Sequence, residues 1–238
     1  MKLSVIIPAY NEEKLIGRCL KSILDAKVPT GTEREVLVIN NASTDKTKEV
    51  CLEFSGIRVV DEPNKGLTKA RQAGLNNAAG QILIYFDADT VIPKNWFFDL
   101  VKIYQDNPEI VGASGPYYYE NLNWFERFVY YDGFSIFFSW LPFQKGFLLG
   151  GNFSVKKWVL EKMGGFDTSI AFYGEDTNLT RRVKEFGPVK TSKRLAVVTS
   201  PRRFKAQGTF RTLVVYIVNF FSELIFRKPA SKKYEDIR

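Results

Sequence analysis

The sequence predicts an α/β fold built on a doubly wound, mostly parallel sheet. Short apolar runs have the length of buried strands, and the segments between them place apolar residues at helical spacing. With 238 residues, 45% of them hydrophobic and 25% charged, the chain can bury a large core. Sheets of this class bind ligands beyond the carboxyl ends of their strands, so the loops after the first, second and fourth strands are where functional residues are expected.

The first half of the chain alternates strongly between the two patterns. A polar loop or a turn with Pro, Asn or Gly separates each strand from the next helix, which is typical of short connections in such folds. In order, we expect a strand at 3–7, a helix within 11–24, a strand at 35–40, a helix at 47–54, a strand at 57–61, a helix at 67–75 and a strand at 81–86.

The second half is less regular. Residues 117–147 hold 14 aromatic residues among 31, a density that a packed core alone rarely reaches. The remaining elements expected are a helix at 93–105, strands at 110–119 and 150–155, and helices at 156–163, 177–186 and 213–226. We therefore expect one domain over residues 1–200, with a ligand-binding half at 1–115 and an irregular half at 116–200, followed by a basic segment at 201–238.

The composition excludes several classes of protein. Without histidine, the chain has no Ser-His-Asp or Cys-His nucleophile system and no histidine-ligated zinc. Phosphate loops of the GxxxxGK[ST] and GxGxxG kinds are absent. Two cysteines form no disulfide framework, no apolar window reaches the length of a membrane span, and the first residues do not resemble a secretory signal. We expect a cytoplasmic protein.

Positive charge is concentrated at the end of the chain. The formal net charge is +8, but residues 181–238 hold 15 Lys and Arg against 4 Asp and Glu. Such a segment indicates an anionic partner, either lipid headgroups or nucleic acid, or else a solvated face that aids solubility.

Two carboxylates follow the fourth expected strand. Asp87 and Asp89 are two residues apart, and extended geometry would place both side chains on one side of the chain. Hard oxygen ligands at a sheet edge suit Mg²⁺ or Mn²⁺, although a solvated turn after a strand often contains Asp as well.

Taken together, the motifs resemble those of family 2 glycosyltransferases, which have the GT-A fold. The resemblance covers roughly residues 3–200 and rests on VIIPAYNEE (5–13), STDKT (43–47), NKGLTKARQAG (64–74), DAD (87–89), GGNFS (150–154), GGFD (164–167) and GEDTNLTRRVKEFG (174–187). It implies a Rossmann-like, doubly wound sheet. It also implies the transfer of a sugar from a nucleotide-sugar donor, with inversion and with a divalent metal.

The resemblance also implies roles for individual residues. Asp89 would bind Mn²⁺ or Mg²⁺ together with Asp87, which lies towards the ribose, and Asp176 of the Glu175-Asp176 pair would be the catalytic base. Gly151, Asn152 and Glu175 would border the sugar and the acceptor. The remaining donor-binding residues would be Pro8, Tyr10, Asn11, Glu12, Asn40, Lys65, Gly66, Arg71 and Ala88, with Arg202 and Arg203 near the diphosphate.

Each role has a simpler alternative. Arg71 could be a surface helix residue, and the glycines could serve packing in a bend. Acidic residues at a helix start, such as Asp176, also complement the helix dipole.

The chain departs from the family pattern after the second strand. Asn40-Asn41-Ala42-Ser43 replaces the usual DDGS. An amide oxygen could accept from the ring N–H of uracil, but an amide could also donate, so a UDP-sugar is the favoured donor while the base stays open.

The expected helix at 213–226 bears on the acceptor. It is apolar except for Asn219, Ser222 and Glu223 and is flanked by Arg211, Arg227 and Lys228, as in helices that lie in the plane of a membrane. Packing on its own domain or in a homodimer is the alternative. We expect a peripheral enzyme on the inner face of the cell membrane that acts on a hydroxyl of a lipid-linked or glycan acceptor, with no nucleic acid partner.

Other functions remain as alternatives. A polyprenyl-phosphate glycosyltransferase would need little base, because its acceptor is already an anion. A non-catalytic membrane adaptor would bind without turnover, and a nucleotidyltransferase would release pyrophosphate.

Overall fold

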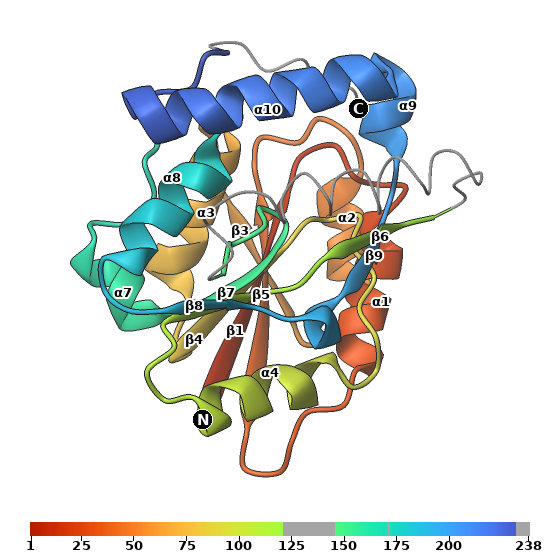
Figure 1. Cartoon of the computed structure of the whole chain (residues 1–238). Coiled ribbons are helices and arrows are strands. Elements are labelled where there is room, and N and C mark those ends of the chain that lie inside the picture. Colours follow the sequence, from red (N-terminus) through yellow and green to blue (C-terminus); the bar gives the residue numbers. More distant parts are fainter. Residues whose placement is uncertain (121–145, 171, 232–238) are drawn as a thin grey trace.

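A computed structural model describes residues 1–120, 146–170 and 172–231 (Figure 1). Most of the aromatic window at 117–147 therefore lies outside the described residues. The elements are β1 (Lys2–Ala9), α1 (Ile16–Asp25), β2 (Glu33–Asn40), α2 (Thr47–Leu52), β3 (Ile57–Asp61), α3 (Leu67–Asn77), β4 (Ile82–Phe86), α4 (Trp96–Asp106), β5 (Gly112–Ser114), β6 (Tyr117–Tyr119), β7 (Asn152–Lys156), α7 (Lys157–Lys162), α8 (Glu175–Lys184), β8 (Val189–Thr191), β9 (Val197–Thr199), α9 (Arg202–Gln207) and α10 (Thr209–Phe226).

The main sheet confirms the α/β prediction. It has seven strands in the order β3-β2-β1-β4-β7-β5-β8, and β1 to β4 are parallel to their neighbours among these four. β7 is antiparallel to β4 and β5, so the turn before β7 meets the carboxyl ends of the parallel strands. The sheet is mixed but mostly parallel.

Helices cover both faces of the sheet (Figure 1). Alternate strand residues enter two separate cores, as the period of a strand requires. Val5 and Ile7 pack with α1, α2 and α4, whereas Ile6 and Leu37 pack with α3, α7 and α8. Burial on both faces explains why the strands are continuous apolar runs rather than alternating ones.

The second half differs from the expected elements in two ways. The single strand expected at 110–119 is two strands, because Gly115 and Pro116 interrupt it and the backbone of Leu195 passes so close to Gly115 that a Cβ there would lie 2.0 Å from the Leu195 carbonyl oxygen. β6 then pairs with β9 in a separate two-stranded sheet. β8, β9 and α9 were not expected at all, and strands of three residues leave little periodicity to detect.

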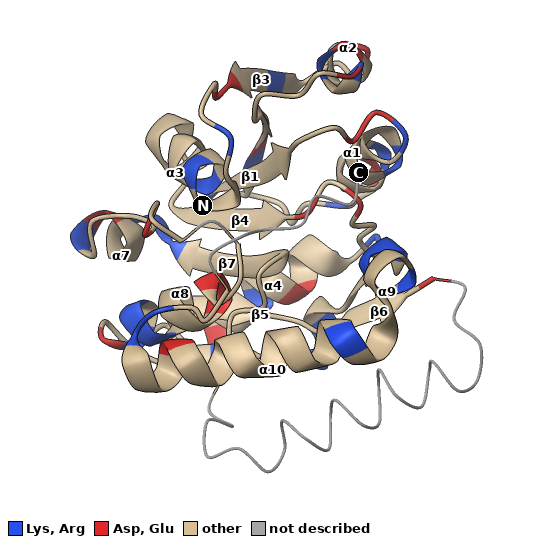
Figure 2. Ribbon diagram, turned by 90° about the horizontal axis from the view of Figure 1, so that it is seen from above, with Lys and Arg blue, Asp and Glu red and all other residues tan. Residues whose placement is uncertain are grey.

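The last helix is longer than expected. α10 has 18 residues and begins at Thr209 rather than Leu213. By length and composition it is the one helix of the described residues that is long and apolar enough to cross a membrane, which corrects the absence of such a window in the sequence analysis. It contacts α8 and α9 at the end of the molecule opposite the N-terminus (Figure 1), and Figure 2 shows it on the side of α8 and β5, away from β3.

Candidate active site

Hydrogen bonds join the loops after β1 and β2 at the carboxyl edge of the sheet. Asn11, which has a positive φ of 50°, donates its backbone N–H to Ser43 Oγ at 3.2 Å and accepts from the Thr44 N–H at its Oδ1 at 2.8 Å. The Glu12 N–H donates to Thr47 Oγ1 at 2.7 Å. These bonds set the position of the segment from Tyr10 to Glu12 after β1, while Pro8 stays within the strand opposite Ile39.

A third loop is attached to the same edge. Asn41 is buried, donates to the carbonyl oxygens of Glu62 and Asn64, and accepts from the Gly66 N–H at 2.8 Å. The loop between β3 and α3 thereby places Lys65 Nζ 3.7 Å from the centre of the Tyr10 ring. The aromatic and the cation expected at the donor are therefore in contact.

Asn40 ends β2 with a defined amide orientation. Its Nδ2 donates to Asp61 Oδ1 at 2.9 Å, and a carboxylate can only accept at neutral pH. The Asn40 Oδ1 is consequently an acceptor, and it is buried without a hydrogen-bond partner. This geometry leaves one unsatisfied acceptor at the end of β2.

The two aspartates after β4 lie in a turn, not in an extended segment. The strand ends at Phe86, and the Thr90 N–H donates to the Asp87 carbonyl at 3.0 Å. The expectation that strand geometry aligns the two side chains is therefore wrong. Asp87 lies against Gly151, whereas Asp89 accepts from Thr199 Oγ1 at 3.1 Å, with the buried Ala88 between them.

Arg202 of α9 connects two of the predicted site residues. It forms a bidentate ion pair with Glu12, and its Nε lies 3.3 Å from Asp89 Oδ2. Both carboxylates are buried, with 2% and 8% of the residue exposed. The Arg203 guanidinium lies 4.3 Å from the centre of the Phe172 ring.

Arg71 is a buried residue, not a surface one. It lies 1% exposed on α3, pairs with Glu175 of α8 and donates to the Gly150 carbonyl oxygen. Burial raises the pKa of the Glu175 carboxyl to about 7, even though the Arg71 guanidinium beside it lowers that pKa. One arginine thus joins the start of α8 to the turn before β7.

Asp176 differs from Glu175 in its contacts. Its Oδ1 accepts from the Thr177 N–H at 2.8 Å, and no ion pair involves it among the described residues. Burial raises the pKa of the Asp176 carboxyl above its ordinary value. Glu175 is paired with Arg71, whereas Asp176 has no ion-pair partner among the described residues.

The turn before β7 leaves no room for side chains. A Cβ on Gly151 would lie 2.0 Å from Asp87 Oδ2, and one on Gly150 would lie 2.5 Å from Glu175 Oε1. The Gly151 N–H donates to the Tyr117 hydroxyl. Asn152, in contrast, is fully buried and donates to the carbonyl oxygens of Gly115 and Leu195, so its contacts are structural.

The carboxylates from distant segments act on one another. Burial raises the pKa of Asp89 to about 6, Arg202 lowers it, and the neighbouring charges of Asp87 and Glu12 raise it further. Asp87 likewise raises the pKa of Glu175, as does Asp176. The structure therefore gathers the predicted acidic residues into one electrostatic network at the carboxyl edge of the sheet.

The donor set fits a divalent cation of the Mg²⁺ or Mn²⁺ type. Such ions commonly take one or two carboxylates and complete their shell with water and substrate phosphates. Asp87 and Asp89 supply hard oxygen ligands at the end of β4, where Asp89 is buried beside Arg202 and Thr199. Across residues 1–120, 146–170 and 172–231, no group of three or more acidic or cysteine side chains forms a complete cage.

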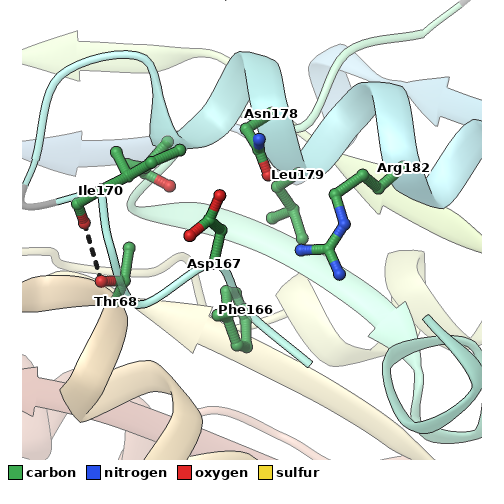
Figure 3. A pocket seen from close by; sticks show the side chains of 8 residues that line it. Thr68, Phe166, Asp167, Ile170, Asn178, Leu179 and Arg182 are labelled. Carbon is green, nitrogen blue, oxygen red and sulfur yellow. Dashed lines mark hydrogen bonds between the residues drawn. The ribbon is translucent and has the colours of Figure 1, made fainter. Parts of the chain in front are cut away.

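A small cavity lies beside Glu175, between α3 and α8 (Figure 3). Its volume is about 10 Å³, close to that of a single water molecule and too small for a sugar. The Thr68 hydroxyl borders it and donates to the Ile170 carbonyl at 2.8 Å, and the Asp167 carboxylate points into the space between the two helices. The cavity is therefore a small packing gap beside Glu175 and not a substrate-binding site.

Sequence reasoning missed several contacts. Thr199, which binds Asp89, follows two apolar residues and carries no motif, and the pairing of Arg71 with Glu175 joins residues 104 positions apart. Asn41 was treated only as part of a departure from the DDGS pattern, although it secures the loop of Lys65.

Known proteins resemble this chain in sequence and in fold. A sequence profile described as "Glycosyl transferase family 2" matches residues 4–164. The "Probable glycosyltransferase YdaM" of Bacillus subtilis is 29% identical over 203 residues, which are 78% of this chain and 47% of that protein. This chain thus spans about half the length of that relative.

Solved structures share the fold. The mannosyltransferase PcManGT from Pyrobaculum calidifontis, in complex with GDP-Man and Mn²⁺, superimposes with a TM-score of 0.75 at 21% identity, over 94% of this chain and 64% of that one. S. aureus TarS 1–349 in complex with UDP-GlcNAc gives a TM-score of 0.65 at 19% identity, over 92% and 67%. At these identities the likeness concerns the fold alone.

Proposed function

The chain belongs to glycosyl transferase family 2, and from this membership we propose that it is an inverting glycosyltransferase that moves a sugar from a nucleotide-sugar donor to an acceptor hydroxyl. One observation carries the proposal. Asp87 and Asp89 after β4 and the Glu175-Asp176 pair of α8 belong to one network of buried and partly buried charges with Arg71 and Arg202. A leaving nucleoside diphosphate needs positive charge near it, and an attacking hydroxyl needs a base that accepts its proton. This network contains groups for both.

Asp176 is the proposed base. In an inverting transfer the acceptor oxygen attacks the anomeric carbon as the bond to the diphosphate breaks, and the hydroxyl proton passes to the base. Asp176 suits this role because its carboxylate has no ion-pair partner among the described residues and its pKa is raised. Glu175 suits a positioning role, since it holds Arg71.

The departing diphosphate is the second element of the proposal. Asp87 and Asp89 would hold Mg²⁺ or Mn²⁺, which stabilises the negative charge that develops on the diphosphate. Arg202 lies beside Asp89 and supplies positive charge at the same edge. A solved relative in fold, PcManGT, contains Mn²⁺ with GDP-Man, which supports this choice of metal.

The proposed donor is a UDP-sugar. The free Oδ1 of Asn40 is an acceptor, and it matches the ring N–H of uracil. Guanine carries a ring N–H too, whereas adenine and cytosine present acceptors at the corresponding edge. Lys65 over Tyr10, at the neighbouring loop, would border the same base or its ribose.

The proposed acceptor is a lipid-linked hydroxyl at the cytoplasmic face of the membrane. The support comes from α10, an apolar helix that contacts α8, whose first turn bears Glu175 and Asp176. A polyprenyl-phosphate acceptor is the second candidate, but an anionic acceptor gives Asp176 no proton to remove.

The test measures nucleoside diphosphate release from a panel of sugar nucleotides, with Mn²⁺ or Mg²⁺ and with or without membrane lipid extract. We expect release from a UDP-sugar that rises with extract. Release of pyrophosphate would identify a nucleotidyltransferase, and binding without any turnover would identify an adaptor. Either result would overturn the proposal.

A further inference from the structure

The amphipathic character of α10 is reversed. A helix on the surface of a soluble domain normally turns its apolar residues inwards and its polar residues outwards. On α10 the polar Thr212, Asn219 and Glu223 are buried at 2%, 1% and 0% exposure. The large apolar side chains that face outwards are Phe210, Val214, Val218, Ile225 and Phe226, which are 81%, 43%, 49%, 64% and 71% exposed.

The outward residues form one stripe. Phe210, Val214 and Val218 are four residues apart and Ile225 follows seven later, so they lie on the same side of the helix. We call these four residues the outer stripe of α10. A contiguous exposed apolar stripe along a helix marks an interaction surface, whereas apolar residues scattered singly over a surface do not.

The polar face of α10 makes hydrogen bonds inside the protein, although Glu223 Oε2 is buried without a partner in the described part of the chain. Glu223 Oε1 accepts from Asn178 Nδ2 of α8 at 2.9 Å and lies 3.8 Å from Arg181 Nη2. Asn219 exchanges two hydrogen bonds with Ser231, each of 2.8 Å. These contacts determine which side of α10 faces out.

The same contacts argue against a spanning orientation. If α10 crossed a bilayer, Glu223 would leave Asn178 and Arg181, and a carboxylate in hydrocarbon is costly. Held on α8, the helix instead lies flat against the domain, and its outer stripe can enter only the interfacial layer of a membrane.

The charges around the outer stripe are of one sign. From Lys205 to Lys228, every exposed charged side chain is basic, and the only acidic residue of that stretch is the buried Glu223. The basic residues are Lys205, Arg211, Arg227 and Lys228. Figure 2 shows α10 largely without charge along its length and basic residues on the neighbouring α9. Apolar side chains framed by cations are complementary to anionic lipid headgroups.

We propose that the outer stripe of α10 docks in the plane of an anionic lipid bilayer. The inference deepens the proposed function and rests on it only for the acceptor: the bilayer would carry the lipid-linked hydroxyl. Because α10 is bonded to α8, whose first turn bears Glu175 and Asp176, the docked helix holds the base close to the membrane surface.

The test is co-sedimentation of the full chain with vesicles, either of phosphatidylcholine alone or with added phosphatidylglycerol. We expect binding that requires phosphatidylglycerol. The double variant Val214→Glu/Val218→Glu should lose at least about tenfold in binding, because two carboxylates replace apolar contacts and repel the anionic surface. Arg227→Gln/Lys228→Gln should lose roughly fivefold for each charge removed.

Leu52→Glu is the matched control. Leu52 is 63% exposed on α2, away from α10, so this variant should bind vesicles as the native protein does. Equal binding by the Val214→Glu/Val218→Glu variant, or an equal loss in Leu52→Glu, would overturn the proposal. So would a native dimer that does not bind vesicles and that Val214→Glu/Val218→Glu converts to a monomer, since a second copy would then cover the stripe.

A second readout separates this proposal from the proposed function. Nucleoside diphosphate release in the absence of lipid should be unchanged in the outer-stripe variant. If the native protein binds vesicles but releases no nucleoside diphosphate from any sugar nucleotide, the proposed function fails and the docking surface stands. If it releases nucleoside diphosphate but does not bind vesicles, the docking surface fails alone.

Discussion

Arg71 and Glu175 form an ion pair that is almost completely withdrawn from solvent, with side chains 1% and 10% exposed. The pair joins α3 to the first turn of α8 across 104 positions of sequence. Through its second contact, with the Gly150 carbonyl oxygen, Arg71 also holds the turn that lies against Asp87. One buried cation therefore sets the relative positions of the proposed metal ligands and the proposed base.

Removing Arg71 should destabilise the protein strongly. Arg71→Met leaves the Glu175 carboxylate buried without its partner, and we expect a loss of about 3–5 kcal/mol in the free energy of unfolding. Urea denaturation measures it. Arg18→Met is the control, because the Arg18 guanidinium is 47% exposed in its pair with Glu120 and should contribute less than about 1 kcal/mol. Similar losses in both variants would contradict the structural role of Arg71.

Glu175 should make stability depend on pH. Its pKa is 4.5 in an ordinary setting and about 7 in the folded protein, so the folded state binds more protons between these values. The contribution of Glu175 to stability is therefore full below pH 4.5 and declines as the pH rises to about 7. Subtracting the profile of Glu175→Gln from that of the native protein should isolate this decline, and a difference that rises with pH would contradict it.

Asp176→Asn should strongly lower the rate of sugar transfer but leave donor binding intact. Loss of a base typically lowers the rate by about 10²–10⁴-fold, while donor affinity, measured by calorimetry, should stay within about twofold. Asp99→Asn removes an acidic residue from the first turn of α4 and controls for the effect of charge on a helix start. Native transfer by Asp176→Asn would show that the base is another residue. The raised pKa of Asp176 predicts that the acid limb of the native rate lies above pH 3.8.

Asp89→Asn should remove the dependence of donor binding on metal. In the native protein a chelator should weaken donor binding at least about tenfold, because the diphosphate loses its cation. The variant should bind weakly with or without chelator. Asp25→Asn, on the exposed end of α1, should behave as the native protein does. If a chelator weakened donor binding by Asp89→Asn as much as it weakens donor binding by the native protein, Asp89 would not be a metal ligand.

Gly151→Ala should impair the donor site without unfolding the protein. The added Cβ would meet Asp87 Oδ2 at 2.0 Å, so the carboxylate must move, and we expect the KM for the donor to rise at least about tenfold. Gly17→Ala is the matched control, since its nearest contact would be an ordinary 3.6 Å and a helical alanine is favoured by about 0.5–1 kcal/mol. An unchanged KM in Gly151→Ala would show that the position of Asp87 is unimportant for the donor.

The sequence by itself determined the first half of the fold. The strands at 3–7, 35–40, 57–61 and 81–86 were recognisable because burial on both faces makes them continuous apolar runs. The same alternation placed Asp87, Asp89 and Asn40 at one edge of the sheet, and the joint spacing of the motifs identified the family. These properties are local, or follow from the order of strands and helices along the chain.

Only the tertiary structure decided which side chains meet. That Arg71 is buried with Glu175 and that Arg202 bridges Glu12 and Asp89 both depend on segments about 100 or more residues apart. The reversed face of α10 is of the same kind. Its composition predicted an amphipathic helix, but contacts with α8 decide that the polar side is the buried one, because Glu223 Oε1 accepts a hydrogen bond from Asn178 there.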